Sequence, residues 1–340
     1  MTPTIRIFTQ ALLTPDLSFE TLGDARVVLD GSGLPRLHRT TRFVEAEIEW
    51  QGRRYLLFLP LSPSALFHIE HTATALRKIN CPALTEYRIL PHELHWQDAC
   101  LHPQTGDLAI QSLPSGKGFS EALFTEYGAT LLAALDALET ELKRAGFVHR
   151  NLKPANLIWS DGRFYPLRYH DAVIGTAEAS DAEAFEALRQ LVRSATSCTE
   201  LHEASVEYTP TSRITGHRWA GNPFEGLICV EDETGFGFVD PDNRPVIPSQ
   251  FLWAGDFHEG RAEVQTAEGM GLIDREGRFV VPAVYEIVEY DPATSIVSVR
   301  QNGLWARFDY TGHRLTEFGT NYAPFGQSDP PKFDHDSSHL

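Results

Sequence analysis

The chain has 340 residues, of which 42% are hydrophobic and 22% charged, and its formal net charge is −17. Such a length predicts about two domains of roughly 100–200 residues each, and such a composition excludes a disordered chain. The acidic balance excludes a surface for nucleic-acid phosphates, and the lack of any apolar run of about 18 residues excludes a membrane-spanning helix.

The first predicted elements are two strands joined by a tight turn. Residues 42–50 alternate between apolar and polar side chains, Gln51-Gly52 forms the turn, and the mostly apolar stretch 53–61 returns as a buried strand. Ser62-Pro63 then opens a helix, because serine is a favoured N-cap and proline fits the first turn. A further strand is predicted at 107–114, before a flexible turn.

The longest predicted helix covers residues 120–145. Apolar side chains recur along it at steps of three and four, including Leu123, Tyr127 and Leu142, and Gly146 ends the pattern. The most informative stretch of the chain follows directly, and it reads His149-Arg150-Asn151-Leu152-Lys153-Pro154-Ala155-Asn156. A short hairpin is predicted after it, so the stretch is expected to form the loop between helix and hairpin.

This stretch resembles the catalytic loop of protein kinases, HRDLKPxN, with Asn151 in place of the aspartate. The resemblance implies a reduced, two-lobed α+β domain over residues 1–200, with an N-lobe over about 1–112 and a truncated C-lobe over about 113–200. In kinases the aspartate is the catalytic base and the final asparagine, here Asn156, holds a magnesium ion. A neutral Asn151 can orient a hydroxyl group but is a poor base, and base assistance is worth ~10²–10⁴ in rate.

Other parts of the kinase pattern are also missing. The strand at 53–61 has no lysine near its end for the nucleotide phosphates, the glycines near residues 31–33 favour a simple β-turn over a Gly-rich loop, and no APE motif follows. The first acid in the place of the second metal ligand is Asp171, but no Phe-Gly follows it. Asp181 resembles the aspartate that braces the catalytic loop, which implies a structural role.

Two functions are compatible with this pattern. The first is a catalytically impaired kinase-like protein, a pseudokinase without a required cofactor, that acts as a protein-interaction or regulatory scaffold. The alternative is an active atypical kinase for proteins or small molecules that binds ATP and Mg²⁺ through Lys153, Asn156 and Asp171. The coincident loss of the strand lysine, the base and the activation segment favours the first.

The second part of the chain repeats with a period of 34–35 residues. Gly237-Phe238-Val239-Asp240 returns as Gly271-Leu272-Ile273-Asp274 and, altered, as Ala306-Arg307-Phe308-Asp309. Val-Ile-Pro at 246–248 likewise returns as Val-Val-Pro at 280–282. Repetition at such a period predicts small units that must stack to bury a core.

These units resemble the bacterial WG repeat, whose Trp-Gly pair stands here as Phe236-Gly237, Met270-Gly271 and Trp305-Ala306. We expect an all-β domain of stacked hairpins over 206–320, with Phe236, Met270 and Trp305 buried between units. Its exposed residues would bind a protein or peptide partner, and the candidates are Trp253, His258 and Tyr290. The tail at 321–340 lacks an apolar pattern and is predicted to be disordered.

The cellular compartment is predicted from the cysteines and the N-terminus. The four cysteines form no CxxC pair, and the first ten residues show no signal-peptide pattern. Both features favour a reducing cytoplasm without a metal or redox centre.

Overall fold

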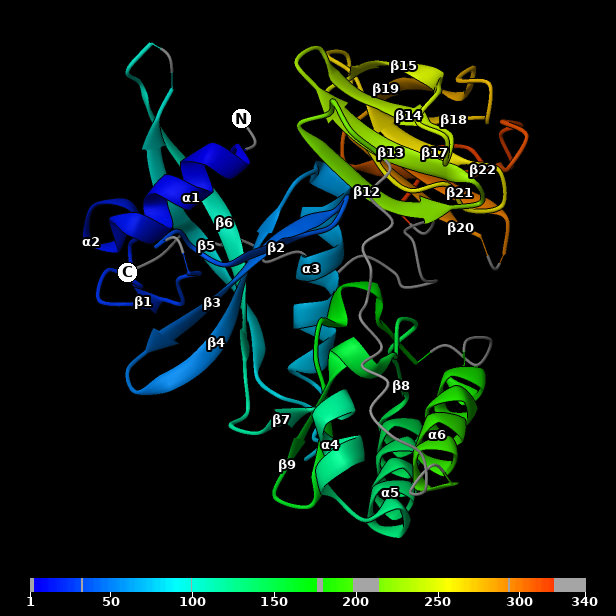
Figure 1. Ribbon diagram of the computed structural model, residues 1–340. Coiled ribbons are helices and arrows are strands. Elements are labelled where there is room, and N and C mark those ends of the chain that lie inside the picture. Colours follow the sequence, from blue (N-terminus) through cyan, green and yellow to red (C-terminus); the bar gives the residue numbers. More distant parts are fainter. Residues whose placement is uncertain are drawn as a thin grey trace, which may run out of the picture. The chain divides into compact units, whose positions relative to one another are not determined.

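The computed structural model describes residues 3–31, 33–98, 100–175, 180–197, 214–292 and 294–320. The chain divides into two compact units, Met1–Glu207 and Tyr208–Leu340, which we call the first and the second unit (Figure 1). The predicted disordered tail at 321–340 lies outside the described residues. Among the helices in the described parts of the chain, none is long and apolar enough to cross a membrane.

The N-terminal half of the first unit is built on one antiparallel sheet with the strand order β1-β3-β4-β6-β5 and with β2 paired to β3. The predicted hairpin is present, because β3 and β4 pair without a shift from Phe43↔Pro60 to Trp50↔Arg53. Gln51 and Gly52 form the turn, and both have positive φ. The strands are β1 (Arg26–Val27), β2 (Leu37–Arg39), β3 (Phe43–Trp50), β4 (Arg53–Pro60), β5 (Tyr87–Gln97) and β6 (Pro103–Ser112).

Helices cover both faces of this sheet. The predicted helix after Ser62 is α3 (Pro63–Leu76), and the Ser62 hydroxyl caps it by accepting from the Ala65 amide. Its buried residues Ala65, Ile69 and Ala73 pack on one face of the sheet. Two helices that the sequence analysis did not predict, α1 (Ile5–Leu13) and α2 (Pro15–Ser18), lie near the N-terminus, and α1 contributes Phe8 and Leu12 to the core on the other face (Figure 1).

The predicted helix over 120–145 is wrong as a single helix. The structure has α4 (Phe119–Thr125) and α5 (Gly128–Ala145), and the chain is extended at Glu126 between them. The Lys117 ammonium binds the Glu126 carboxylate at 2.7 Å and the Thr125 hydroxyl at 2.7 Å, which holds the break open. Tyr127, expected on the apolar face, is 86% exposed as a result.

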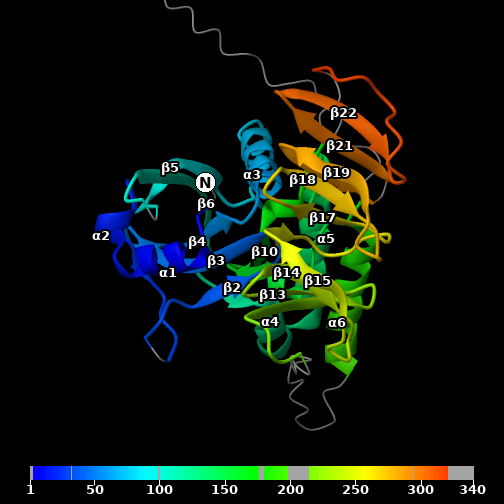
Figure 2. The same cartoon turned by 90° about the horizontal axis from the view of Figure 1, so that it is seen from above.

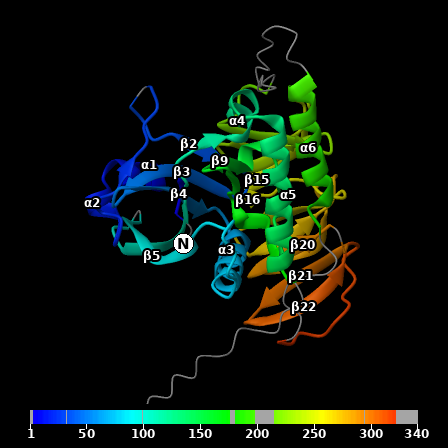
Figure 3. The ribbon, with the colours of Figure 1, turned by 90° about the horizontal axis from the view of Figure 1, so that it is seen from below.

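The remaining elements of the first unit surround α5. Figure 3 shows α6 (Ala182–Ser197) beside α5, and the Arg189 guanidinium of α6 pairs with Glu139 and with Asp136 of α5. The short elements are β7 (Lys117–Gly118), β8 (Phe147–Val148), η1 (Pro154–Asn156), β9 (Leu157–Ser160), β10 (Arg163–Pro166), η2 (Tyr169–Asp171) and β11 (Val173–Ile174). Strands β9 and β10 form the predicted hairpin.

The second unit consists of three antiparallel sheets, one after another in the sequence, which follow each other in a stack (Figure 2). The first is β12 (Trp219–Phe224), β13 (Leu227–Asp232), β14 (Gly235–Val239) and β15 (Pro245–Phe251). The second is β16 (Trp253–Ala254), β17 (Ala262–Gln265), β18 (Met270–Ile273) and β19 (Phe279–Tyr285). The third is β20 (Ile287–Asp291), β21 (Ile296–Gln301) and β22 (Leu304–Asp309). The predicted fold class, an α+β unit followed by stacked hairpins, is confirmed.

The repeated position held by Phe236, Met270 and Trp305 faces the interior of the stack. Phe236, Met270 and Trp305 are 7%, 1% and 2% exposed. The glycine after the first two lies against the backbone of the next strand, since a Cβ on Gly237 would lie 2.6 Å from the Ser249 nitrogen, and one on Gly271 would lie 2.8 Å from the Ala283 Cα. The repeat therefore needs glycine there for close approach rather than for a positive φ.

One predicted surface residue is buried. Trp253, the first residue of β16, is 2% exposed. It is the counterpart of Trp219 in β12, which is partly buried and packs on the Phe236 ring with centroids 6.5 Å apart. Both tryptophans are therefore part of the stack. His258 is exposed, as expected, and Tyr290 is partly buried.

The third repeat has a charged residue at a position where the other two repeats have an apolar core residue. The core positions of Phe238 and Leu272, which are 1% and 0% exposed, are taken by Arg307. Thr316 lies beside it, and its hydroxyl accepts from the Arg307 amide at 2.9 Å.

The repeated aspartate forms the turn of each hairpin. One carboxylate oxygen of Asp240, Asp274 and Asp309 accepts from two backbone amides, two and four residues further on, at 2.8–3.0 Å. This is an Asx turn, in which the side chain replaces a backbone acceptor. Burial by itself would raise the pKa of Asp274, but the Arg278 amide and guanidinium hold it below its usual range.

Replacing Asp274 with alanine should lower the free energy of unfolding of the second unit by about 1 kcal/mol, because two backbone amides lose their acceptor. Asp274→Asn keeps a carbonyl acceptor and should lose less. Since the folded pKa is lowered, the charged carboxylate contributes stability above about pH 4 and loses it as the pH falls through the folded value. Urea unfolding at pH 7 and pH 3 tests this, and an equal loss for both variants at pH 7 would contradict it.

Candidate functional site

The kinase-like motif lies in a loop of the first unit, between β8 and β9. His149 is fully buried at its start, and Asn156, which is 2% exposed, ends the short 3-10 turn η1. Arg150 and Lys153 are exposed on the loop, and Arg150 has a φ of 61°. The loop thus presents its basic side chains outward and its histidine and final asparagine inward.

Asp181 braces the backbone of this loop from the start of α6. Its two carboxylate oxygens accept from the His149 amide at 2.6 Å and from the Arg150 amide at 2.9 Å. The His149 ring fixes the other side through a contact of 2.7 Å between Nε2 and the Leu167 carbonyl. These contacts correspond to the structural role that the resemblance implied for Asp181.

Asn151 connects the two groups that were candidates for a metal site. Its side-chain amide donates to the Asp171 carboxylate at 3.1 Å, and its backbone carbonyl accepts from the side-chain amide of Asn156 at 2.7 Å. The Asn151 side chain is therefore turned toward Asp171. It can orient Asp171, but as an amide it takes no proton from a substrate.

Arg168 brings a positive charge to the same place. Its guanidinium forms two contacts with the Glu45 carboxylate of β3, at 2.7 Å and 2.5 Å. Nη1 also donates to the Ala155 carbonyl at 2.8 Å and to the Asn156 Oδ1 at 3.2 Å. The side-chain oxygen of Asn156 therefore already faces a cation of the chain itself.

The two residues after Arg168 are also held against the sheet. The Tyr169 hydroxyl accepts from the Thr85 amide at 2.9 Å. The His170 ring stacks on Phe43 with centroids 4.1 Å apart and meets the edge of Phe58 at 4.5 Å. Because Phe43 and Phe58 are almost fully buried, the space between β3, β4 and the loop is packed with aromatic rings.

The buried titratable groups have a defined charge at neutral pH. Burial lowers the pKa of His170 to about 3, and burial together with the charge of Arg42 lowers that of His68 to about 3. Burial opposes ionisation of Asp171, but the charge of Arg42 outweighs it, so that its pKa lies below the usual value. The site therefore contains neutral histidines, and the carboxylate of Glu45 is paired with Arg168.

Sequence reasoning missed the part played by Arg168. Counted from the motif at 149–156, the second metal ligand of a kinase would fall near residue 168 or 169. This chain has an arginine there, and a cation at that position was the signal in the sequence. Its partner Glu45 lies 123 positions earlier in the chain. Glu70 of α3 is exposed.

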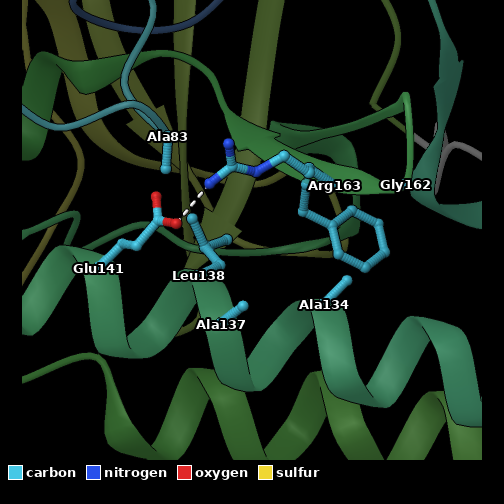
Figure 4. Close-up of a pocket in the computed structure, with 8 residues that line it drawn as sticks. Ala83, Ala134, Ala137, Leu138, Glu141, Gly162 and Arg163 are labelled. Carbon is cyan, nitrogen blue, oxygen red and sulfur yellow. Dashed lines mark hydrogen bonds and ion pairs between the residues drawn. The ribbon is translucent and has the colours of Figure 1, made fainter.

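Two cavities in the described parts of the chain lie away from this loop. One of about 30 Å³ lies between α5 and β10, where Glu141 pairs with Arg163 across its wall (Figure 4). The other, of about 540 Å³, is an open depression of the second unit near His217 and Asp232. Neither is lined by residues of the loop 149–156.

Comparisons with known proteins identify the repeats. Residues 236–268 and 270–305 match the model of the WG containing repeat, so the predicted resemblance is confirmed for this part of the chain. No curated protein sequence gives a significant match. Among solved structures, the chain is similar to the Rio2 kinase of Chaetomium thermophilum in complex with ADP/Mg²⁺-phosphoaspartate, with 14% identity and a TM-score of 0.32. That similarity covers 49% of this chain and 55% of the kinase chain.

Proposed function

We propose that the first unit is a kinase-like domain that has lost phosphotransfer and that the protein acts as an interaction or regulatory scaffold. The observation that carries this proposal is Arg168. Its guanidinium lies between Glu45 and Asn156, so a divalent metal at Asn156 would have to displace an ion pair with two hydrogen-bonded contacts. Repulsion between Arg168 and a metal ion adds to that cost.

Two further features support loss of chemistry. The base position is occupied by Asn151, whose amide already donates to Asp171. The β4 strand contributes Phe58 to the packed interior, where a phosphate-binding lysine would be needed. An active kinase that uses Lys153, Asn156 and Asp171 would require release of Asn156 from Arg168 and of Asp171 from Asn151.

The second unit is proposed to supply the binding surface. From residue 206 onward the chain has 10 Lys and Arg against 21 Asp and Glu, a difference of −11. Charge complementarity favours a basic protein or peptide as the partner, because opposite charge speeds association and selects the partner. Binding should therefore weaken as salt screens the surface charge.

Thermal shift with ATP tests the proposal for the first unit. A ligand at 100 times its Kd would stabilise a folded unit by about 2.7 kcal/mol and raise its Tm by several degrees. We expect no such rise with ATP, with or without Mg²⁺, and no transfer of labelled γ-phosphate to the chain or to a generic protein. Asn151→Asp alone should not restore transfer.

The opposite outcome is equally specific. If Mg²⁺-ATP raises the Tm and label is transferred, and if both effects are lost in Asn156→Ala and in Asp171→Ala, the protein is an active atypical kinase. Lys78→Ala, at an exposed position after α3, serves as the matched control and should change neither readout.

A further inference from the structure

His217 lies at the entrance to the second unit, just before β12, and both of its ring nitrogens face an oxygen. Nδ1 is 2.6 Å from Oδ1 of Asp232 on β13, and Nε2 is 3.1 Å from Oδ1 of Asn243 in the turn before β15. The His217 side chain is 15% exposed. One ring thus joins the entering segment to two separate parts of the first repeat.

The orientation of the Asn243 amide is fixed by its other contact. Its Nδ2 donates to the Thr215 carbonyl at 3.0 Å, which leaves the oxygen to face the histidine. Asp232 accepts a second hydrogen bond, from the Ser249 hydroxyl at 2.6 Å. This bond from Ser249, more than the contact with His217, lowers the pKa of Asp232 against the effect of burial, so the carboxylate is charged at neutral pH.

A neutral imidazole has one N–H group and can donate only once, whereas the imidazolium donates from both nitrogens. Two acceptors in fixed positions therefore require the charged ring. The neighbouring charges are mixed. Glu233 and Arg218 pair with each other at 3.4 Å, and in the turn that holds Asn243 the Arg244 guanidinium pairs with Asp242 at 2.6 Å and with Asp240 at 3.4 Å.

We propose that His217 is a proton-dependent clasp that fastens the segment 214–218 to the first repeat. With the proton present, the ring donates to Asp232 and to Asn243. When the proton is lost, one nitrogen presents a lone pair to an oxygen, and that contact becomes repulsive. The segment then loses one hydrogen bond of the His217 ring. The bond from the Arg218 amide to the Glu231 carbonyl remains.

The clasp has a consequence for the surface of the repeat. Ile214 and Ala220 pack against a small apolar cluster formed by Ile228, Val230 and Val239, each less than 5% exposed. Opening of the segment uncovers this cluster at the first edge of the stack. The direction is defined: the segment is closed at lower pH and opens as the pH rises through the titration of His217.

Nitrogen-resolved NMR of the full chain labelled with ¹⁵N-histidine tests the proposal, with the His217 signals assigned by their absence in His217→Gln. We expect both His217 nitrogens to carry a proton at every pH at which residues 214–220 are protected from hydrogen exchange. Asp232→Asn should move the titration to lower pH, by about one pH unit or more, and Asn243→Asp should move it to higher pH.

Two results would overturn the proposal. One is a His217 ring with a single protonated nitrogen in the native chain at a pH at which residues 214–220 remain protected. The other is an unchanged titration in both Asp232→Asn and Asn243→Asp, which would show that neither oxygen holds the proton. Hydrogen exchange of residues 214–220, corrected for the intrinsic effect of pH, should increase above the titration in the native chain and should be fast at all pH values in His217→Gln. Protection that is independent of pH in the native chain would also contradict the clasp.

Discussion

Replacing Arg168 with alanine is expected to lower the free energy of unfolding of the first unit by about 3–5 kcal/mol, the usual cost of removing one partner of a buried ion pair. The Glu45 side chain is 9% exposed and would remain as a buried charge without its partner. The Ala155 carbonyl and the Asn156 oxygen would lose their donor as well. Urea unfolding of the full chain, followed through the first unit, measures the effect.

Three control variants separate the ion pair from other causes. Arg168→Met combined with Glu45→Met should recover most of the loss, because an apolar pair of similar volume avoids the unpaired charge. Arg168→Gly should cost about 1 kcal/mol less than Arg168→Ala, since residue 168 has a φ of 62° and glycine adopts this conformation without strain. Arg193→Ala, in a pair that is half exposed, should change stability by less than about 1 kcal/mol. A loss in the double Met variant as large as in Arg168→Ala would contradict the electrostatic explanation.

The same variants connect stability to function. If Arg168 excludes a metal ion from Asn156, its removal makes the Asn156 oxygen and the Glu45 carboxylate available to a divalent ion. The proposed loss of ATP binding has a second cause, however, in the rings of Phe43, Phe58 and His170. We therefore expect Arg168→Ala to gain no stability from Mg²⁺-ATP, even at temperatures where it remains folded.

The elements that could be predicted from the sequence are those set by local patterns. The β3–β4 hairpin follows from alternation and a turn pair, and the stacked repeats follow from a period of 34–35 residues. The loop at 149–156 follows from a motif in which local spacing is decisive. In each case the information lies within about 35 residues of the chain.

The parts that could not be predicted depend on distant contacts. The break between α4 and α5 lies where Lys117 binds Thr125 and Glu126. The apolar periodicity of 120–145 does not indicate this break. Trp253 is buried although it lies outside the repeated positions of Phe236, Met270 and Trp305. Its place in β16 repeats that of Trp219 in β12. The ion pair of Arg168 with Glu45 joins residues 123 positions apart, and a single sequence holds no signal for such a pairing.

Replacing Trp305 with alanine is expected to lower the free energy of unfolding of the second unit by about 3–5 kcal/mol, as for a large buried aromatic residue. Trp305 is 2% exposed on β22, where it pairs with Arg300 of β21 and exchanges two backbone hydrogen bonds of 2.8 Å with Gly319. Its loss leaves a cavity at the terminal repeat. Stacked repeats draw stability from their neighbours, so the C-terminal repeat should lose hydrogen-exchange protection first.

The neighbouring residue provides the matched control for this prediction. Leu304 precedes Trp305 on the same strand but is 39% exposed, and Leu304→Ala should cost far less than Trp305→Ala. Trp305→Phe should lie between the two, because a phenyl ring fills part of the space. If Trp305→Ala leaves the melting of the second unit unchanged while it abolishes binding of a partner, Trp305 is a contact residue. In that case the repeated position of Phe236, Met270 and Trp305 serves recognition, and the stack draws its stability from the glycine contacts and Asx turns instead.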